Sequence, residues 1–317
     1  MNSLFLGIDG GQSSTTTLVG DETGRVLGAG QAGPCNHVGA GEGGDKLRCA
    51  VVDSVAHACR AANIDPEHLQ FEAACVGMSG GPADKQAILS EILRARKLVV
   101  THDALIALSG ATGGEPGIAT IAGTGSIAFG RNAAGKTARV GGWGYIFGDE
   151  GSGFDIARQA LRAALRSEEG WGPSTALRTA LLEETGATGA NDLLHRFYTQ
   201  DWPRSRVAQL ARLVDRVALD GDPVAHDILN SAAQHLAALT ASVRVQLFPE
   251  GEPVMMAYIG GVFRSRILLE RYRHLIELEE GNRCREPLHS PAAGALLEAY
   301  REAGIHPELS KIPELKT

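Results

Sequence analysis

Two short segments of this sequence bring glycines together with hydroxyl residues at the turn between two predicted strands. They are residues 9–15 (DGGQSST) and residues 123–126 (GTGS). Glycines at such a turn let backbone N–H groups approach phosphate oxygens, and serine or threonine hydroxyls can donate further hydrogen bonds. Asp9, at the end of the preceding strand, could hold Mg²⁺ through water. The predicted phosphate-binding residues are Gly10, Gly11, Ser13, Ser14, Thr15, Gly123, Thr124 and Gly125.

Neither segment matches the common nucleotide-binding loops. A P-loop needs a lysine and a serine or threonine after its glycines, and a dinucleotide-binding loop needs a helix directly after them. Each segment alone is also compatible with an ordinary turn of small residues. Because the same design opens two separate β-meanders, we predict that both segments bind one polyphosphate. The 40 glycines among 317 residues, well above the usual ~7%, also favour backbone held close to a ligand.

A carboxylate, Asp103, follows a predicted buried strand and opens a predicted helix. The carboxyl ends of strands in α/β sheets are where ligands usually bind. Asp103 could therefore be a general base that accepts a hydroxyl proton. Aspartate is also a favoured N-cap residue, so a purely structural role in capping the helix is the alternative.

The densest candidate segment is residues 141–151, which interleave glycines, aromatic residues and the carboxylate pair Asp149 and Glu150 just before a helix. Carboxylates accept hydrogen bonds from sugar hydroxyls, and aromatic side chains pack on the apolar faces of a sugar. We therefore predict a sugar-binding segment. The alternative is a glycine-rich loop whose Trp143 fills the core. A further pair, Gly260 and Gly261, joins a strand to a helix, where backbone could lie against a ligand ring or a phosphate; such a turn is also common in α/β proteins.

Hydrophobic patterning predicts the elements that position these residues. A β-meander over about 4–30 is followed by helices over 45–62 and 83–96, a strand over 72–78 and another over 98–100. A second meander over about 118–140 precedes helical sequence over 154–248, a strand over 255–259 and two final helices. The repetition predicts two related α/β halves. One is residues 1–113 with a returning helix at about 290–303, and the other is residues 114–289.

Composition excludes several classes of function. The net charge is −7 and no lysine or arginine run occurs, so we expect no nucleic-acid partner. No stretch approaches the roughly 18 apolar residues of a membrane span, and Asp9 interrupts the first apolar run, so we expect neither a membrane partner nor a signal peptide. The five cysteines show no metal or disulfide spacing, which favours free thiols in the cytoplasm.

The order of these motifs resembles the N-acetylglucosamine kinase-like branch of the BadF/BadG/BcrA/BcrD ATPase family, in the sugar kinase/Hsp70/actin superfamily, over about residues 4–303. The resemblance implies an α/β, two-lobed, actin-like ATPase (ribonuclease H-like) fold, in which each lobe is a mixed sheet flanked by helices and the ligand cleft lies between the lobes. It implies ATP and Mg²⁺ as cofactors and Asp103 as the catalytic aspartate. The implied sugar contacts are Asn36, Asp103, Ser126, Ile127, Gly142, Trp143, Gly144, Asp149 and Glu150. Further implied nucleotide contacts are Ala218, Gly260, Gly261 and Ser265.

The implied activity is ATP-dependent phosphorylation of N-acetylglucosamine at its 6-hydroxyl, by a cytoplasmic enzyme that we expect to be a homodimer. Glucosamine kinase, or another amino-sugar kinase, is the alternative, since Asp149 or Glu150 could bind a free 2-ammonium group. A non-catalytic sugar sensor or an ATP-driven activator is the rival of another class. The sequence departs from the family pattern at Ser14, where a basic residue is frequent. It also lacks the cysteine clusters of the zinc-binding and iron–sulfur branches.

Overall fold

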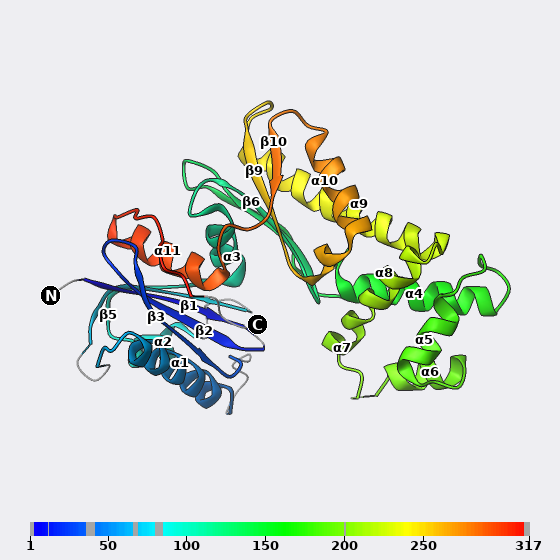
Figure 1. Cartoon of the computed structure of the whole chain (residues 1–317), viewed down its shortest axis with the longest axis horizontal. Coiled ribbons are helices and arrows are strands. Elements are labelled where there is room, and N and C mark those ends of the chain that lie inside the picture. Colours follow the sequence, from blue (N-terminus) through cyan, green and yellow to red (C-terminus); the bar gives the residue numbers. More distant parts are fainter. Residues whose placement is uncertain are drawn as a thin grey trace. The chain divides into compact units, whose positions relative to one another are not determined.

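The computed structural model describes residues 3–11, 13–35, 42–65, 69–79, 85–199 and 201–313, and the chain divides into two compact units (Figure 1). Unit 1 comprises Met1–Glu115 and Pro287–Thr317, and unit 2 comprises Pro116–Glu286. Each unit contains its own five-stranded sheet. Among the described residues, no helix is both long and apolar enough to cross a membrane.

Unit 1 is built on a sheet with the strand order β3-β2-β1-β4-β5. The first three strands form the predicted antiparallel meander, and β4 and β5 add to it in parallel with β1. The register pairs Asp9 with Gly77, and Gly77 with Thr101, so the carboxyl ends of β1, β4 and β5 lie at one edge. The strands are β1 Leu4–Gly10, β2 Thr15–Asp21, β3 Val26–Ala32, β4 Phe71–Met78 and β5 Ala95–His102.

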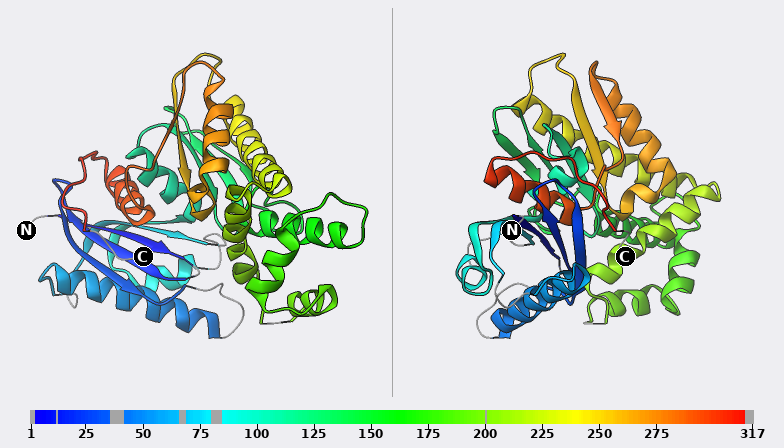
Figure 2. Two further views of the ribbon diagram at one scale, coloured as in Figure 1. Left: turned by 45° about the vertical axis from the view of Figure 1, so that its right-hand side comes forward. Right: turned by 60° about the vertical axis from the view of Figure 1, so that its left-hand side comes forward.

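Helices cover both faces of this sheet, as Figures 1 and 2 show. Alternate residues of β1 point to opposite faces: Leu6 lies in one core cluster with residues of α1 and α2, and Phe5 lies in another with residues of α11. The last helix packs tightly, because a Cβ on Gly7 would lie 2.3 Å from the backbone nitrogen of Leu296. The helices are α1 Glu42–Ala61, α2 Gln86–Ile92, α3 Asp103–Thr112 and α11 Pro291–Ala303.

The helix predicted over 83–96 is too long. The structure ends α2 at Ile92 and begins β5 at Ala95. The N–H of Phe71 donates to the carbonyl of Arg94 (2.9 Å), and Phe71 is paired with Ala95 at the start of the parallel β4–β5 ladder. Pairing with β4 therefore overrides the local helical pattern, which a sequence window cannot detect.

Unit 2 repeats the plan of unit 1, with the strand order β10-β9-β6-β7-β8. β6, β7 and β8 form an antiparallel meander, and β9 and β10 continue the sheet in parallel with β6. The sequence did not predict β10, which has only four residues and no apolar alternation. The strands are β6 Gly117–Ala122, β7 Ser126–Arg131, β8 Thr137–Gly141, β9 Val254–Ile259 and β10 Asn282–Arg285.

The helical part of unit 2 starts directly after the segment predicted to bind sugar. Its long helix α9 contacts β6, β7 and β8, and α10 packs on α9. Breaks occur near the predicted positions, at Gly170, Gly186, Pro203 and Gly221. The helices are α4 Gly153–Glu168, α5 Leu177–Thr185, α6 Ala190–Phe197, α7 Arg204–Gln209, α8 Ala211–Leu219, α9 Pro223–Leu247 and α10 Arg266–Glu277, with a 3₁₀ turn η1 at Gly261–Arg264.

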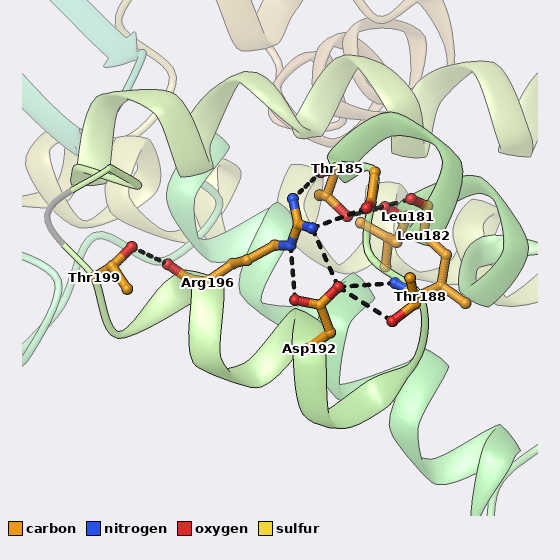
Figure 3. A network of polar contacts seen from close by, with 8 residues as sticks. Leu181, Leu182, Thr185, Thr188, Asp192, Arg196 and Thr199 are labelled. Carbon is orange, nitrogen blue, oxygen red and sulfur yellow. Dashed lines mark hydrogen bonds and ion pairs between the residues drawn. The ribbon is translucent and has the colours of Figure 1, made fainter.

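A polar network closes the turn between α5 and α6, as Figure 3 shows. Arg196 donates to the carbonyls of Thr185 (2.8 Å) and Gly186 (2.9 Å) at the end of α5, and forms an ion pair with Asp192. Asp192 also accepts the N–H of Thr188 (2.9 Å). These hydrogen bonds lower the pKa of Asp192 to about 2, with the Arg196 bond the largest cause. One arginine thus satisfies the open carbonyls of a helix end and fixes the next helix to it.

Candidate active site

The carboxyl edge of the unit 1 sheet brings two carboxylates close together. Asp9 lies on β1, and Asp103 directly follows β5 as the first residue of α3. Burial, and to a lesser degree the neighbouring Asp103 carboxylate, raises the pKa of Asp9 to about 7. Neighbouring acids with a raised pKa are typical of catalytic and metal-binding sites.

Asp103 does not cap its helix. The N-cap of α3 is His102, whose ring Nδ1 accepts the N–H of Leu105 (3.2 Å). The exposed Asp103 carboxylate instead accepts a hydrogen bond from the hydroxyl of Ser79 (2.8 Å), at the end of β4. The capping alternative is therefore wrong, and the carboxylate is oriented by a neighbouring strand. Sequence reasoning did not select Ser79, although its place at the end of a buried strand was a usable signal.

The first glycine segment forms a closed turn between β1 and β2. The N–H of Gly11 donates to the carbonyl of Ser14 (3.0 Å). Ser13 and Ser14 are exposed, and their hydroxyls have no partner within the described residues, so both can donate to a ligand. A Cβ on Gly10 would lie 2.5 Å from the Cε of Met78, at the flexible end of that side chain.

The predicted role of the Thr15 hydroxyl is not supported. Thr15 is fully buried, and its hydroxyl donates to the carbonyl of Gly33 (2.9 Å) and lies 2.8 Å from the Cys35 thiol. It therefore ties β2 to the segment after β3 and does not face a ligand. Asn36, a predicted sugar contact, lies outside the described residues, as does Gln12 of the first glycine segment.

The second glycine segment joins β6 to β7. The N–H of Gly123 donates to the carbonyl of Gly125 (2.9 Å), and the carbonyl of Gly123 accepts the N–H of Gly153 (2.8 Å) at the start of α4. The N–H groups of Thr124 and Gly125 have no acceptor in the part of the chain that the structure describes. Two adjacent N–H groups without an acceptor are available to donate to an anion.

Asp149 lies beside this segment and is almost completely buried. Its carboxylate accepts the N–H of Ser126 (3.2 Å) and forms an ion pair with Arg204. The hydroxyl of Ser126 donates to the carbonyl of Glu150 (2.7 Å). The acceptor predicted for sugar hydroxyls thus also holds the second glycine segment in place. Sequence reasoning missed Arg204, because 55 residues separate it from Asp149.

This ion pair also explains Gly125. A Cβ there would lie 2.9 Å from the Nη2 of Arg204 and 2.9 Å from the Oδ2 of Asp149. The sequence assigned this glycine to close approach of a phosphate. The structure adds a reason within the protein, since any side chain at residue 125 would meet the ion pair.

The aromatic part of residues 141–151 faces solvent. Trp143 is 67% exposed and Phe147 is 83% exposed, so the alternative in which Trp143 fills the core is wrong. Gly142 and Gly144 have φ of +73° and +83°, which L residues rarely adopt. The Arg139 guanidinium lies 4.6 Å from the centroid of the Trp143 ring. Exposed aromatics on a loop whose turns are formed by glycines are consistent with a ligand-binding surface.

The remaining predicted nucleotide contacts fall into two groups. Gly260 and Gly261 follow β9 beside the end of β6, and a Cβ on Gly260 would lie 2.3 Å from the carbonyl of Ala122. They therefore share an edge of the sheet with the second glycine segment. Ala218 is buried in α8, and the hydroxyl of Ser265 accepts the N–H of Leu268 (3.3 Å) to cap α10. The side chains of these last two residues have structural roles within unit 2.

The arrangement of two such sheets in one chain matches that of known sugar kinases. The chain is similar to the crystal structure of a protein from Chromobacterium violaceum assigned as an N-acetylglucosamine kinase, with a TM-score of 0.76 and 25% identity, covering 93% of this chain and 98% of that one. The predicted α/β, actin-like sugar-kinase fold is therefore confirmed.

The chain belongs to the BadF/BadG/BcrA/BcrD ATPase family, which it matches over residues 6–299. It is 34% identical over 283 residues to the N-acetyl-D-glucosamine kinase of Dictyostelium discoideum, covering 84% of this chain and 87% of the relative. It is also 34% identical over 215 residues to the N-acetylmuramic acid/N-acetylglucosamine kinase of Clostridium acetobutylicum, covering 66% and 70%. The family predicted from the motifs is confirmed.

Proposed function

We propose that this protein is an ATP-dependent amino-sugar kinase that transfers the γ-phosphoryl group of ATP to the 6-hydroxyl of N-acetylglucosamine. The observation that carries the proposal is the Asp103 carboxylate, which does not cap its helix and is oriented by a hydrogen bond from Ser79. The 34% identity to two kinases of N-acetylated sugars supports the substrate class. We further propose a cytoplasmic homodimer.

Asp103 accepts the proton of the sugar hydroxyl and directs its oxygen at the phosphorus. A general base of this kind typically accelerates a reaction by about 10²–10⁴-fold. The hydrogen bond from Ser79 fixes the carboxylate rotamer, so that the base is already in position when the sugar binds.

The acidic pair suits a magnesium ion. The carboxylates of Asp9 and Asp103 are close enough to raise the pKa of Asp9, and a divalent cation would relieve that repulsion. Carboxylate and water oxygens are the ligands that Mg²⁺ prefers, and Asp9 would hold it through water. The ion would neutralise charge on the ATP phosphates.

The phosphate oxygens of ATP accept hydrogen bonds from two sets of donors. The first set consists of the exposed hydroxyls of Ser13 and Ser14 and the backbone at Gly10 and Gly11. The second set consists of the N–H groups of Thr124 and Gly125. Gly260 and Gly261 present backbone to the nucleoside, and Ala218 and Ser265 are proposed to contact it through their main chains. The two serine hydroxyls make up in part for the missing basic residue at position 14.

The sugar is bound by the segment that follows β8. Trp143 packs against an apolar face of the sugar. The sugar hydroxyls form hydrogen bonds with the backbone at Gly142 and Gly144 and with the carboxylates of Asp149 and Glu150. Ser126 and Ile127, at the start of β7, complete this surface. Because a site built to bond a polar group rejects analogues that lack it, the 2-acetamido group should distinguish N-acetylglucosamine from glucose.

A panel of sugars in a coupled ADP-release assay tests the proposal. N-acetylglucosamine should have a higher kcat/KM than glucosamine, N-acetylmuramic acid and glucose. Higher kcat/KM with glucosamine would reassign the enzyme to the free amino sugar. No phosphorylation of any sugar, with intact ATP binding by calorimetry, would overturn the kinase and favour a sensor.

A further inference from the structure

Arg204 connects four separate parts of unit 2. It is the first residue of α7, and its guanidinium forms an ion pair with Asp149 and donates to the carbonyl of Thr124 (3.4 Å). The same group lies 5.2 Å from the ring centroid of Tyr145 and 5.8 Å from that of Phe154. The two rings pack edge to face, with centroids 5.0 Å apart.

This ion pair differs from the surface pairs of the molecule. The Asp149 side chain is only 4% exposed and that of Arg204 is 35% exposed, whereas Arg266 and Glu270 in the pair on α10 are 85% and 67% exposed. Exposed pairs contribute little, whereas a buried carboxylate that loses its partner is strongly destabilised. Asp149 also has a φ of +64°, a strained conformation for a residue with a side chain, so its contacts must hold it there.

Both segments proposed to bind substrates depend on this pair. Through Asp149, Arg204 fixes the N–H of Ser126 at the end of the second glycine segment, and it bonds the carbonyl of Thr124 directly. Through Tyr145, it packs on the sugar-binding segment. A Cβ at Gly125 would meet both charged groups, so the segment is shaped around them.

We propose that Arg204 is a positioning residue that locks the second glycine segment to the sugar-binding segment, so that the phosphate donors and the sugar acceptors are held as one body. The inference rests on the proposed kinase function for its kinetic consequences. Its structural consequence, the order of residues 123–126 and 142–150 without ligands, does not depend on that function.

The test compares Arg204→Met with Arg206→Met. The control removes an exposed arginine from the same helix that stacks on Trp202, with its guanidinium 4.1 Å from the ring centroid, and donates to the carbonyl of Asp201 (2.8 Å). Since small displacements in a positioned site can cost as much as 10²-fold, R204M should raise the KM for both sugar and ATP by roughly 10- to 100-fold. R206M should leave both within about twofold, and Arg204→Lys, which keeps the charge, should recover part of the loss.

Hydrogen exchange of the unliganded proteins separates positioning from simple loss of folded enzyme. In R204M, the amides of residues 123–126 and 142–150 should exchange faster while those of unit 1 do not change. A fall in kcat with both KM values unchanged would overturn the proposal, as would unchanged exchange in both segments. If R204M does not fold, R204K decides by the same two measurements. If the wild type phosphorylates no sugar, the proposed function fails, and exchange still tests Arg204.

Discussion

The two units share one sheet plan, but the candidate-site carboxylates in the two units have opposite electrostatic environments. In unit 1, Asp9 and Asp103 lie close together, Asp103 accepts a hydrogen bond from the hydroxyl of Ser79, and burial with the Asp103 carboxylate raises the pKa of Asp9 to about 7. In unit 2, Asp149 is buried against the guanidinium of Arg204. A carboxylate with a raised pKa is suited to binding a proton or a cation, whereas a carboxylate paired with a guanidinium fixes a shape. We therefore propose a chemical role for the pair Asp9 and Asp103 and a positioning role for the pair Asp149 and Arg204.

Removing the base should produce the largest effect. Asp103→Asn keeps the volume but cannot accept the hydroxyl proton, so kcat should fall by roughly 10²–10⁴-fold. ATP affinity, measured by calorimetry, should change little. A variant with more than about a tenth of the wild-type kcat would show that Asp103 is not the base.

The next largest effect is expected from filling the space at residue 125, in the second glycine segment. In Gly125→Val, the side chain meets the Asp149–Arg204 pair, and overpacking of this kind costs about 1–3 kcal/mol. If the segment shifts to relieve this contact, the N–H groups of Thr124 and Gly125 move away from the phosphate, so ATP should bind more weakly, by up to about 10²-fold, with an unchanged circular dichroism spectrum. Unchanged ATP affinity would mean that this segment does not bind phosphate.

The ion pair itself can be measured by a double-mutant cycle of Asp149→Ala and Arg204→Met. Asp149→Ala removes the proposed acceptor of a sugar hydroxyl and leaves that hydroxyl unpaired, so sugar binding should weaken about 5- to 150-fold, from a loss of about 1–3 kcal/mol. The two changes should be non-additive by about 0.5–3 kcal/mol in sugar binding, because the residues are in contact. Additive effects would show that Asp149 and Arg204 do not act as a pair in sugar binding.

The smallest effect concerns how the ionisation of Asp9 makes folding stability depend on pH. Because the folded-state pKa of Asp9 lies above its unfolded value of 3.8, the folded state holds the proton more tightly, and stability is lost as pH rises from about 4 through 7. Asp9→Asn removes this penalty. It should raise Tm at pH 8 by roughly 2–4 °C per kcal/mol gained, with no gain near pH 4. An equal shift at both pH values in a thermal melt would exclude ionisation of Asp9 as the cause.

Much of the fold could be predicted from the chain alone. The two meanders, the strand that ends at Met78, the strand over 254–259 and most helix breaks follow from local apolar patterns and from glycine and proline positions. The exceptions are elements that depend on a neighbour. β5 takes residues from a predicted helix because β4 pairs with it, and β10 exists only through its pairing with β9.

From the sequence alone, the candidate site could be located to the level of segments. Glycines, hydroxyls and carboxylates at strand ends mark Asp9, Asp103 and both glycine segments, because residue type and local conformation are short-range properties. The contacts that each side chain makes depend on the tertiary structure. It turned the hydroxyl of Thr15 inward, capped α3 with His102 instead of Asp103, and paired Asp149 with Arg204 across 55 residues. The strength of an electrostatic or hydrogen-bonding partner depends on distance and burial, which the chain acquires only when distant segments pack together.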